Sequence, residues 1–76
     1  SAKNKLTYKE KLELQALSEE IEKMELEKTN IERIFNGETT LPPGSSFDLV
    51  SQRYSAIKDM LDEKELRWLE LSDKES

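Results

Sequence analysis

Apolar residues recur at alternating steps of three and four in two stretches of this chain. We call the two sets together the seam. The first set is Leu14, Leu17, Ile21, Met24, Ile31 and Phe35, and the second is Phe47, Val50, Tyr54, Ile57, Leu61, Trp68 and Leu71. Lys28 and Lys64 occupy one position in each series. Such a heptad pattern places an apolar stripe along a helix and is typical of coiled coils.

Capping residues mark both ends of the first predicted helix. Thr7 followed by Glu10 fits a capping box, in which each side chain bonds the other residue's backbone amide. The end is marked by Asn36 and Gly37, because glycine readily takes the left-handed conformation after a helix. The first helix is therefore predicted over residues 8–35.

Turn-forming residues separate this helix from the second one. Residues 36–45 contain both prolines of the chain and are predicted to form a loop, with Leu41 tucked back against the helices. Ser45 is the predicted N-cap of a second helix over residues 46–72, and Asp48 suits the dipole of its first turn.

Two helices of similar length joined by a short loop must run antiparallel. We therefore predict an all-α fold, a two-helix antiparallel coiled-coil hairpin over residues 7–72. Residues 1–6 are predicted to be a basic linker or tail, and residues 73–76 a frayed C-terminus.

Two alignments of the seam, one heptad apart, are open. The first pairs Leu14 with Leu71, Leu17 with Trp68, Met24 with Leu61, Ile31 with Tyr54 and Phe35 with Val50. The second pairs Glu10 with Trp68, Leu17 with Leu61 and Ile31 with Phe47. Ion pairs beside the seam do not decide between the two alignments. The first alignment allows pairs of Glu20 with Arg67 and of Glu25 with Lys58. The second allows pairs of Glu27 with Arg53 and of Lys11 with Glu65. The first is preferred because it covers the large Trp68 side chain with apolar neighbours.

Some residues depart from the simple seam and allow two interpretations each. Lys28 and Lys64 either fix the pairing of the helices or bury their stems while their ammonium groups reach nearby glutamates. Several apolar residues lie off the seam and either strengthen the helices or form a further contact surface. They are Leu12, Leu26, Met60, Leu66 and Leu69.

The composition excludes most chemistry. Without cysteine or histidine, the chain has no thiolate zinc site, no cysteine nucleophile and no imidazole base. Adjacent carboxylates such as Glu19 and Glu20 point apart on a helix and are read as solvated. No phosphate-binding loop or metal-ligand spacing occurs, and no apolar run approaches the ~18 residues of a membrane span. We expect no catalytic residue, cofactor or metal in this chain.

The net charge of -5 is unevenly distributed. Lys3, Lys5, Lys9 and Lys11 against Glu10 give residues 1–11 a charge of +3, so the remainder carries -8. Lysines near a helix N-terminus favour anions, which makes these four lysines the candidate nucleic-acid-binding residues. The alternative is a charged, solubilising tail.

The sequence around the first capping box resembles a known family. Leu6 to Leu14, followed by Leu17, Glu20, Ile21, Leu26 and Glu27, resembles the entry to the C-terminal coiled-coil domain of Uup-type ABC-F ATPases. Leu61, Glu65, Arg67, Trp68, Glu70 and Leu71 are similar to the end of that domain's second helix.

This resemblance implies a cytoplasmic parent protein whose two preceding cassettes bind ATP and magnesium. In that family the domain is associated with DNA binding and the full proteins with the ribosome. The chain departs from this pattern because acidic residues outnumber lysine and arginine after Lys11. Two functions are therefore considered. One is an accessory module that binds DNA or ribosomal RNA, and the other is a protein-interaction arm that docks on the ATPase cassettes, another protein or a second copy.

Overall fold

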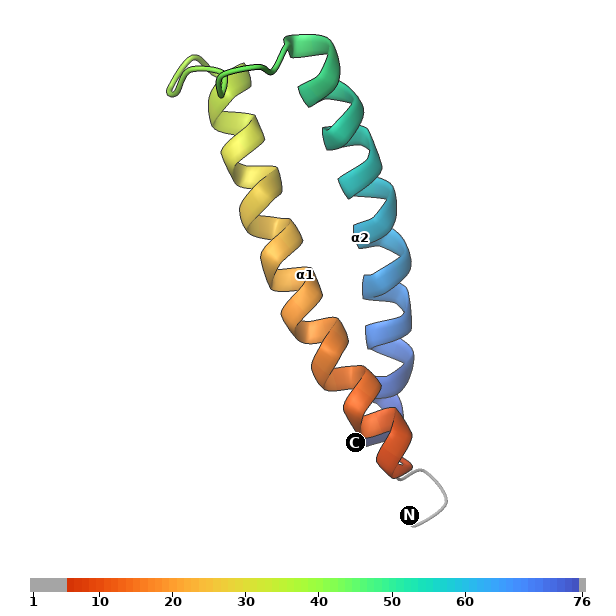
Figure 1. Ribbon diagram of the computed structural model, residues 1–76. Coiled ribbons are helices and arrows are strands. Elements are labelled where there is room, and N and C mark those ends of the chain that lie inside the picture. Colours follow the sequence, from red (N-terminus) through yellow and green to blue (C-terminus); the bar gives the residue numbers. More distant parts are fainter. Residues whose placement is uncertain (1–5, 76) are drawn as a thin grey trace.

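The computed structural model describes residues 6–75, which form two α-helices and a connecting loop. α1 covers Tyr8–Phe35 and α2 covers Phe47–Glu75. The helices lie side by side and are joined by the loop at one end, so they run antiparallel (Figure 1). We call the other end, where α1 begins and α2 ends, the open end. The predicted all-α two-helix hairpin is confirmed.

The first helix begins and ends where the sequence predicts. The Glu10 backbone N–H donates to Thr7 Oγ1 at 3.1 Å, and the Thr7 N–H donates to Glu10 Oε1 at 3.0 Å, which completes the capping box. After the helix, Gly37 adopts a φ of 77°. A residue with a Cβ rarely takes this conformation, so glycine suits the exit into the loop.

Both ends of α2 differ from the prediction. Ser46, not Ser45, is the N-cap, because its Oγ accepts a hydrogen bond from the Leu49 N–H at 3.2 Å. Ser45 instead donates its N–H to the Pro42 carbonyl in a turn of the loop, at 3.1 Å. The helix also continues through residues 73–75, which were expected to fray. Lys74 is paired with a carboxylate of α1, and this contact favours the helical last turn.

The seam side chains form two apolar clusters. The loop-side cluster consists of buried Ile31, Val50, Ile57 and Leu61, with Ile21, Met24, Leu41, Tyr54 and Met60 packed against it. The open-end cluster consists of buried Leu6, Leu17 and Leu71, with Leu14, Ile21 and Trp68 packed against it. Ile21 therefore contacts both clusters and makes the apolar interior continuous.

These contacts agree with the preferred alignment. Leu14, Leu17, Trp68 and Leu71 share one cluster, whereas Met24, Ile31, Tyr54 and Leu61 share the other. Glu10, which the second alignment places beside Trp68, instead forms an ion pair with Lys74.

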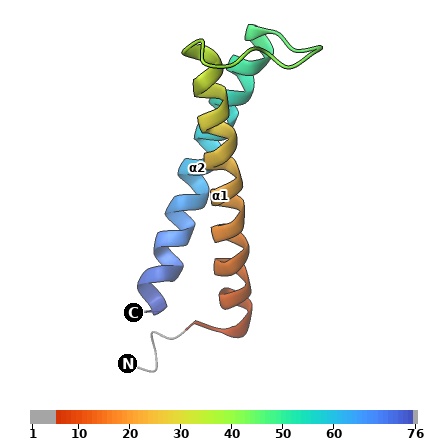
Figure 2. The same cartoon turned by 90° about the vertical axis from the view of Figure 1, so that its left-hand side faces the viewer.

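The phenylalanines next to the loop differ from the other seam residues. Phe35 is 43% exposed and Phe47 is 57% exposed. The helices are inclined to each other: in Figure 1 their ribbons are apart near the loop and overlap at the open end, and in Figure 2 the reverse is seen. Because α1 ends at Phe35, no further turn of α1 covers these two side chains. The Phe35 ring is partly covered by the edge of Tyr54, with ring centres 5.4 Å apart.

Replacing Leu61 with alanine tests the seam, because Leu61 is 4% exposed within the loop-side cluster. The cavity should lower the free energy of unfolding by about 2 to 5 kcal/mol. The matched control is Leu66→Ala on the same helix, since Leu66 is 63% exposed. Urea unfolding followed by circular dichroism should show a change within about 0.5 kcal/mol for the control. Equal losses in the two variants would contradict the described packing.

Candidate functional site

Three ion pairs join the helices along one side of the hairpin. Glu13 binds Arg67, Glu20 binds Lys64 and Glu27 binds Arg53. The three glutamates are spaced by seven residues, so they lie along the same side of α1. We call this side the ion-paired edge.

The two arginine pairs are bidentate. Arg53 donates to both carboxylate oxygens of Glu27 at 2.6 and 2.9 Å, and Arg67 does the same to Glu13 at 2.7 and 3.0 Å. The Glu27–Arg53 pair is one that the sequence predicts for the second alignment, although the apolar clusters agree with the first. The first alignment predicts a pair between Glu20 and Arg67, but Glu20 pairs with Lys64 instead. Long side chains reach diagonal neighbours across the seam, so flanking charge does not report the alignment.

These contacts change the acidity of the carboxylates. The hydrogen bond from Arg67 lowers the pKa of Glu13, and the hydrogen bond from Arg53 lowers the pKa of Glu27. The pKa of Glu10 is lowered mainly by the hydrogen bond that it accepts from Lys74. The open end is thereby tied through ionised glutamates at neutral pH.

The two lysines of the seam extend from the apolar contact toward carboxylates. Lys28 Nζ lies 3.9 Å from Glu32, and Lys64 Nζ lies 3.3 Å from Glu20. Their side chains are 30% and 26% exposed, so the stems are mostly covered while the charged ends reach glutamates. This is the arrangement of a snorkelling lysine.

The opposite side of the hairpin has different contacts. Ser18 lies two residues before Glu20, about 200° around α1, and accepts a hydrogen bond from Trp68 Nε1 at 2.9 Å. Further along, the Tyr54 hydroxyl donates to Glu32 at 2.7 Å, and this bond raises the pKa of Tyr54. We call this side the aromatic edge.

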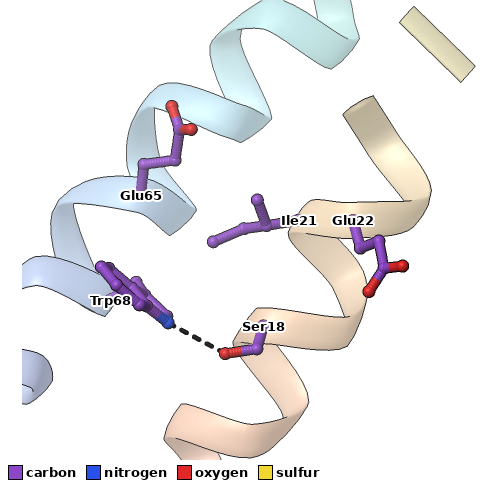
Figure 3. Close-up of a pocket in the computed structure, with 5 residues that line it drawn as sticks. All are labelled: Ser18, Ile21, Glu22, Glu65 and Trp68. Atoms are coloured by element: carbon purple, nitrogen blue, oxygen red, sulfur yellow. Dashed lines mark hydrogen bonds between the residues drawn. The ribbon is translucent and has the colours of Figure 1, made fainter. Parts of the chain in front are cut away.

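Two larger open grooves flank the seam, beside a smaller pocket of about 100 Å³ lined by Glu25, Lys28, Lys58, Leu61, Asp62 and Glu65. The tryptophan groove, of about 340 Å³, lies on the aromatic edge and is lined by Ser18, Ile21, Glu22, Glu65 and Trp68 (Figure 3). The loop groove, of about 400 Å³, lies next to the loop and is lined by Glu27, Asn30, Ile31, Ile34, Pro42, Ser45, Leu49, Val50 and Arg53. Neither was predicted from the sequence, because each depends on side chains from both helices.

The candidate nucleic-acid-binding lysines are only partly described. Lys3 and Lys5 lie outside residues 6–75, so their placement is not described. Lys9 and Lys11 are exposed in the first turn of α1, and neither forms an ion pair within residues 6–75. Since they are two residues apart on a helix, they point about 200° apart and do not form one stripe.

Most off-seam apolar residues are exposed, as their position predicts. Leu12 and Leu26 of α1 are 50% and 62% exposed, and Leu66 and Leu69 of α2 are 63% and 53% exposed. Met60 differs, because it packs against the loop-side cluster.

Leu6 is the core residue that the sequence analysis missed. It was assigned to the basic tail, yet it is 8% exposed and packs with Leu17 and Leu71. Leu6 directly precedes the N-cap Thr7, a position where an apolar residue often packs against the following helix. The position of Leu6 before the N-cap could therefore have indicated from the sequence that its side chain is buried.

Residues 6–75 contain no group of acidic side chains arranged to hold a metal ion. Neither helix is long and apolar enough, over this same range, to cross a membrane.

Comparison with known families agrees with this architecture. The ABC transporter C-terminal domain family matches residues 5–73. No curated protein and no solved structure matches the chain significantly. The match spans both helices and confirms the resemblance drawn from the sequence at the level of this C-terminal domain.

The bidentate ion pairs predict how stability depends on pH. The pKa values of Glu13 and Glu27 are lowered from 4.5 in the folded state, so both pairs stabilise the fold above this pH. That contribution is lost as the pH falls through 4.5 and below. Between pH 7 and pH 3, the urea concentration at the unfolding midpoint should fall less for the double variant Glu13→Gln/Glu27→Gln than for the unmodified chain.

The control is Glu19→Gln/Glu63→Gln, which changes two exposed glutamates that form no ion pair within the described part of the chain. This variant should keep the pH dependence of the unmodified chain. If the urea midpoints of both variants fell equally between pH 7 and pH 3, the ion-paired edge would not be the source of the pH dependence.

Proposed function

Since the chain belongs to the ABC transporter C-terminal domain family, we propose that it is a non-catalytic accessory domain of an ABC-F type ATPase that contributes nucleic-acid contacts. In this proposal the parent protein is cytoplasmic and its cassettes bind ATP and magnesium. The hairpin supplies a binding surface for DNA or ribosomal RNA, and the cassettes carry out hydrolysis.

The availability of the lysines at the open end supports this function. Lys28, Arg53, Lys64, Arg67 and Lys74 are all engaged by glutamates. By contrast, Lys9 and Lys11 form no ion pair within residues 6–75; Lys23 and Arg33 are unpaired as well, but Lys9 and Lys11 lie in the first turn of α1, where the helix dipole favours anions. An unpaired lysine can exchange its counterions for a phosphate backbone without first breaking an internal ion pair.

A second candidate function is a protein-interaction arm. It is favoured by the exposure of Leu12 and Leu26 on α1 and of Leu66 and Leu69 on α2. The partners considered are the ATPase cassettes of the parent, another protein or a second copy.

Titration of the 76-residue chain with labelled nucleic acid tests the first function. Binding to a DNA duplex or an RNA hairpin should weaken with salt, with a log–log slope of about -3.6 if four lysines contact duplex phosphates. This corresponds to roughly 100-fold between 50 and 200 mM salt. Fluorescence anisotropy of the labelled nucleic acid measures the affinity at each salt concentration.

Matched variants separate local contact from overall charge. Lys9→Ala/Lys11→Ala should weaken binding and make the salt slope shallower by about 1, because the two lysines point to opposite sides of α1 and only one can face a bound duplex directly. Lys23→Ala/Arg33→Ala removes the same charge from exposed positions of α1 and should change the slope little. Absence of binding by the unmodified chain at low salt, or equal losses in both variants, would reject nucleic-acid contact at this end.

Light scattering tests the second-copy form of the alternative function. If the exposed leucines pair two hairpins, the molar mass should rise with concentration, and Leu66→Ala/Leu69→Ala should remove the rise. Leu12→Ala/Leu26→Ala shows whether α1 takes part. A constant monomer mass across the concentration range would exclude a second copy as the partner.

A further inference from the structure

The tryptophan groove combines a fixed aromatic surface with acidic residues. The Trp68 Nε1–H is held by Ser18 Oγ at 2.9 Å, which fixes the orientation of the indole. In Figure 3, Ile21 projects from α1 toward the space beside the ring, whereas Glu22 and Glu65, which also line the groove, turn their carboxylates outward, away from the indole. The groove therefore offers apolar and aromatic contact inside and hydrogen-bond acceptors outside.

The carboxylates that line this groove form no ion pair within the described structure, although Glu65 also lines a small neighbouring pocket with Lys28 and Lys58. No basic residue lines the tryptophan groove itself, and neither Glu22 nor Glu65 forms an ion pair with another described residue. On the ion-paired edge, by contrast, every joining glutamate has an arginine or lysine partner. A positively charged occupant would therefore meet carboxylates that no ion pair holds.

We propose that the tryptophan groove binds an arginine side chain presented by a basic segment of a protein partner. A guanidinium stacks on the face of an indole and donates two parallel hydrogen bonds to a carboxylate. Its aliphatic stem suits the surface of Ile21. Lysine carries the same charge as a compact, strongly hydrated ammonium without the planar face, so arginine matches this combination better.

The surrounding charge selects a protein segment over a nucleic acid. Residues 18–25 and 62–65 contain seven acidic residues and two lysines, a balance of -5. One of these lysines, Lys64, is already paired with Glu20. This field attracts a cationic peptide and repels a phosphate backbone. The inference goes beyond the proposed nucleic-acid function and uses different residues, so either can fail without the other.

Trp68 is the only tryptophan of the chain, so its fluorescence reports occupancy of the groove. The probe is a capped peptide of alternating arginine and alanine, titrated into the 76-residue chain. The matched control peptide has citrulline in place of arginine, which keeps the shape and removes the charge. We expect a saturable change in Trp68 emission with the arginine peptide and none with the citrulline peptide.

Two double variants locate the binding. Glu22→Gln/Glu65→Gln should weaken the affinity for the arginine peptide by about 3- to 10-fold. Glu19→Gln/Glu63→Gln makes the same change in net charge at exposed residues that do not line the groove, and should reduce affinity less than 2-fold. Circular dichroism verifies that both variants remain helical.

Several results would overturn the proposal. They are unchanged emission with the arginine peptide, an equal response to citrulline, or equal weakening by the two double variants. A change of Trp68 emission with protein concentration alone would instead assign the groove to a second copy. A lysine version of the peptide that binds as tightly would remove the assigned preference for arginine.

Discussion

Mutual burial of two apolar stripes is the constraint on which this structure depends. Each helix carries a single stripe, and an isolated helix of 28 residues with so many charges gains little stability without a partner surface. The loop brings the second stripe into contact with the first, and Ile57 and Leu71 become fully covered. Once the stripes face each other, each flanking side chain lies within reach of only a few residues of the other helix.

The ion-paired edge follows from this alignment. Glu13 and Glu27 meet Arg67 and Arg53, which are spaced by fourteen residues on each helix. Met60 stands midway between the two arginines and packs into the loop-side cluster, so Glu20 takes Lys64 from the next turn. On the aromatic edge Glu32 is paired with Lys28, whereas Glu22 and Glu65 form no ion pair within the described residues.

Periodicity and capping chemistry act locally, which is why they predicted the bounds of α1, the hairpin and the alignment of its seam. Features that depend on how the two helices meet in space were not predictable in this way. Phe47 fits the heptad but lies beyond the end of α1 in the alignment that pairs Phe35 with Val50, and Leu6 lies outside the heptad yet is buried. The grooves likewise require the distance between helices, since Trp68 and Ile21 come from different elements.

A basic end and an acidic middle can act separately on one rigid hairpin. Lys11 and Glu22 are eleven residues apart on α1, or about 16 Å along the axis at the rise of an α-helix. Exposed charges at that distance are largely screened at physiological salt, where the Debye length is about 8 Å. The acidic middle therefore does not cancel the field of the open-end lysines. Since α2 ends there with Glu70 and Asp73, a phosphate backbone at that end would meet individual exposed lysines, whereas a cationic peptide would meet an acidic surface at the tryptophan groove.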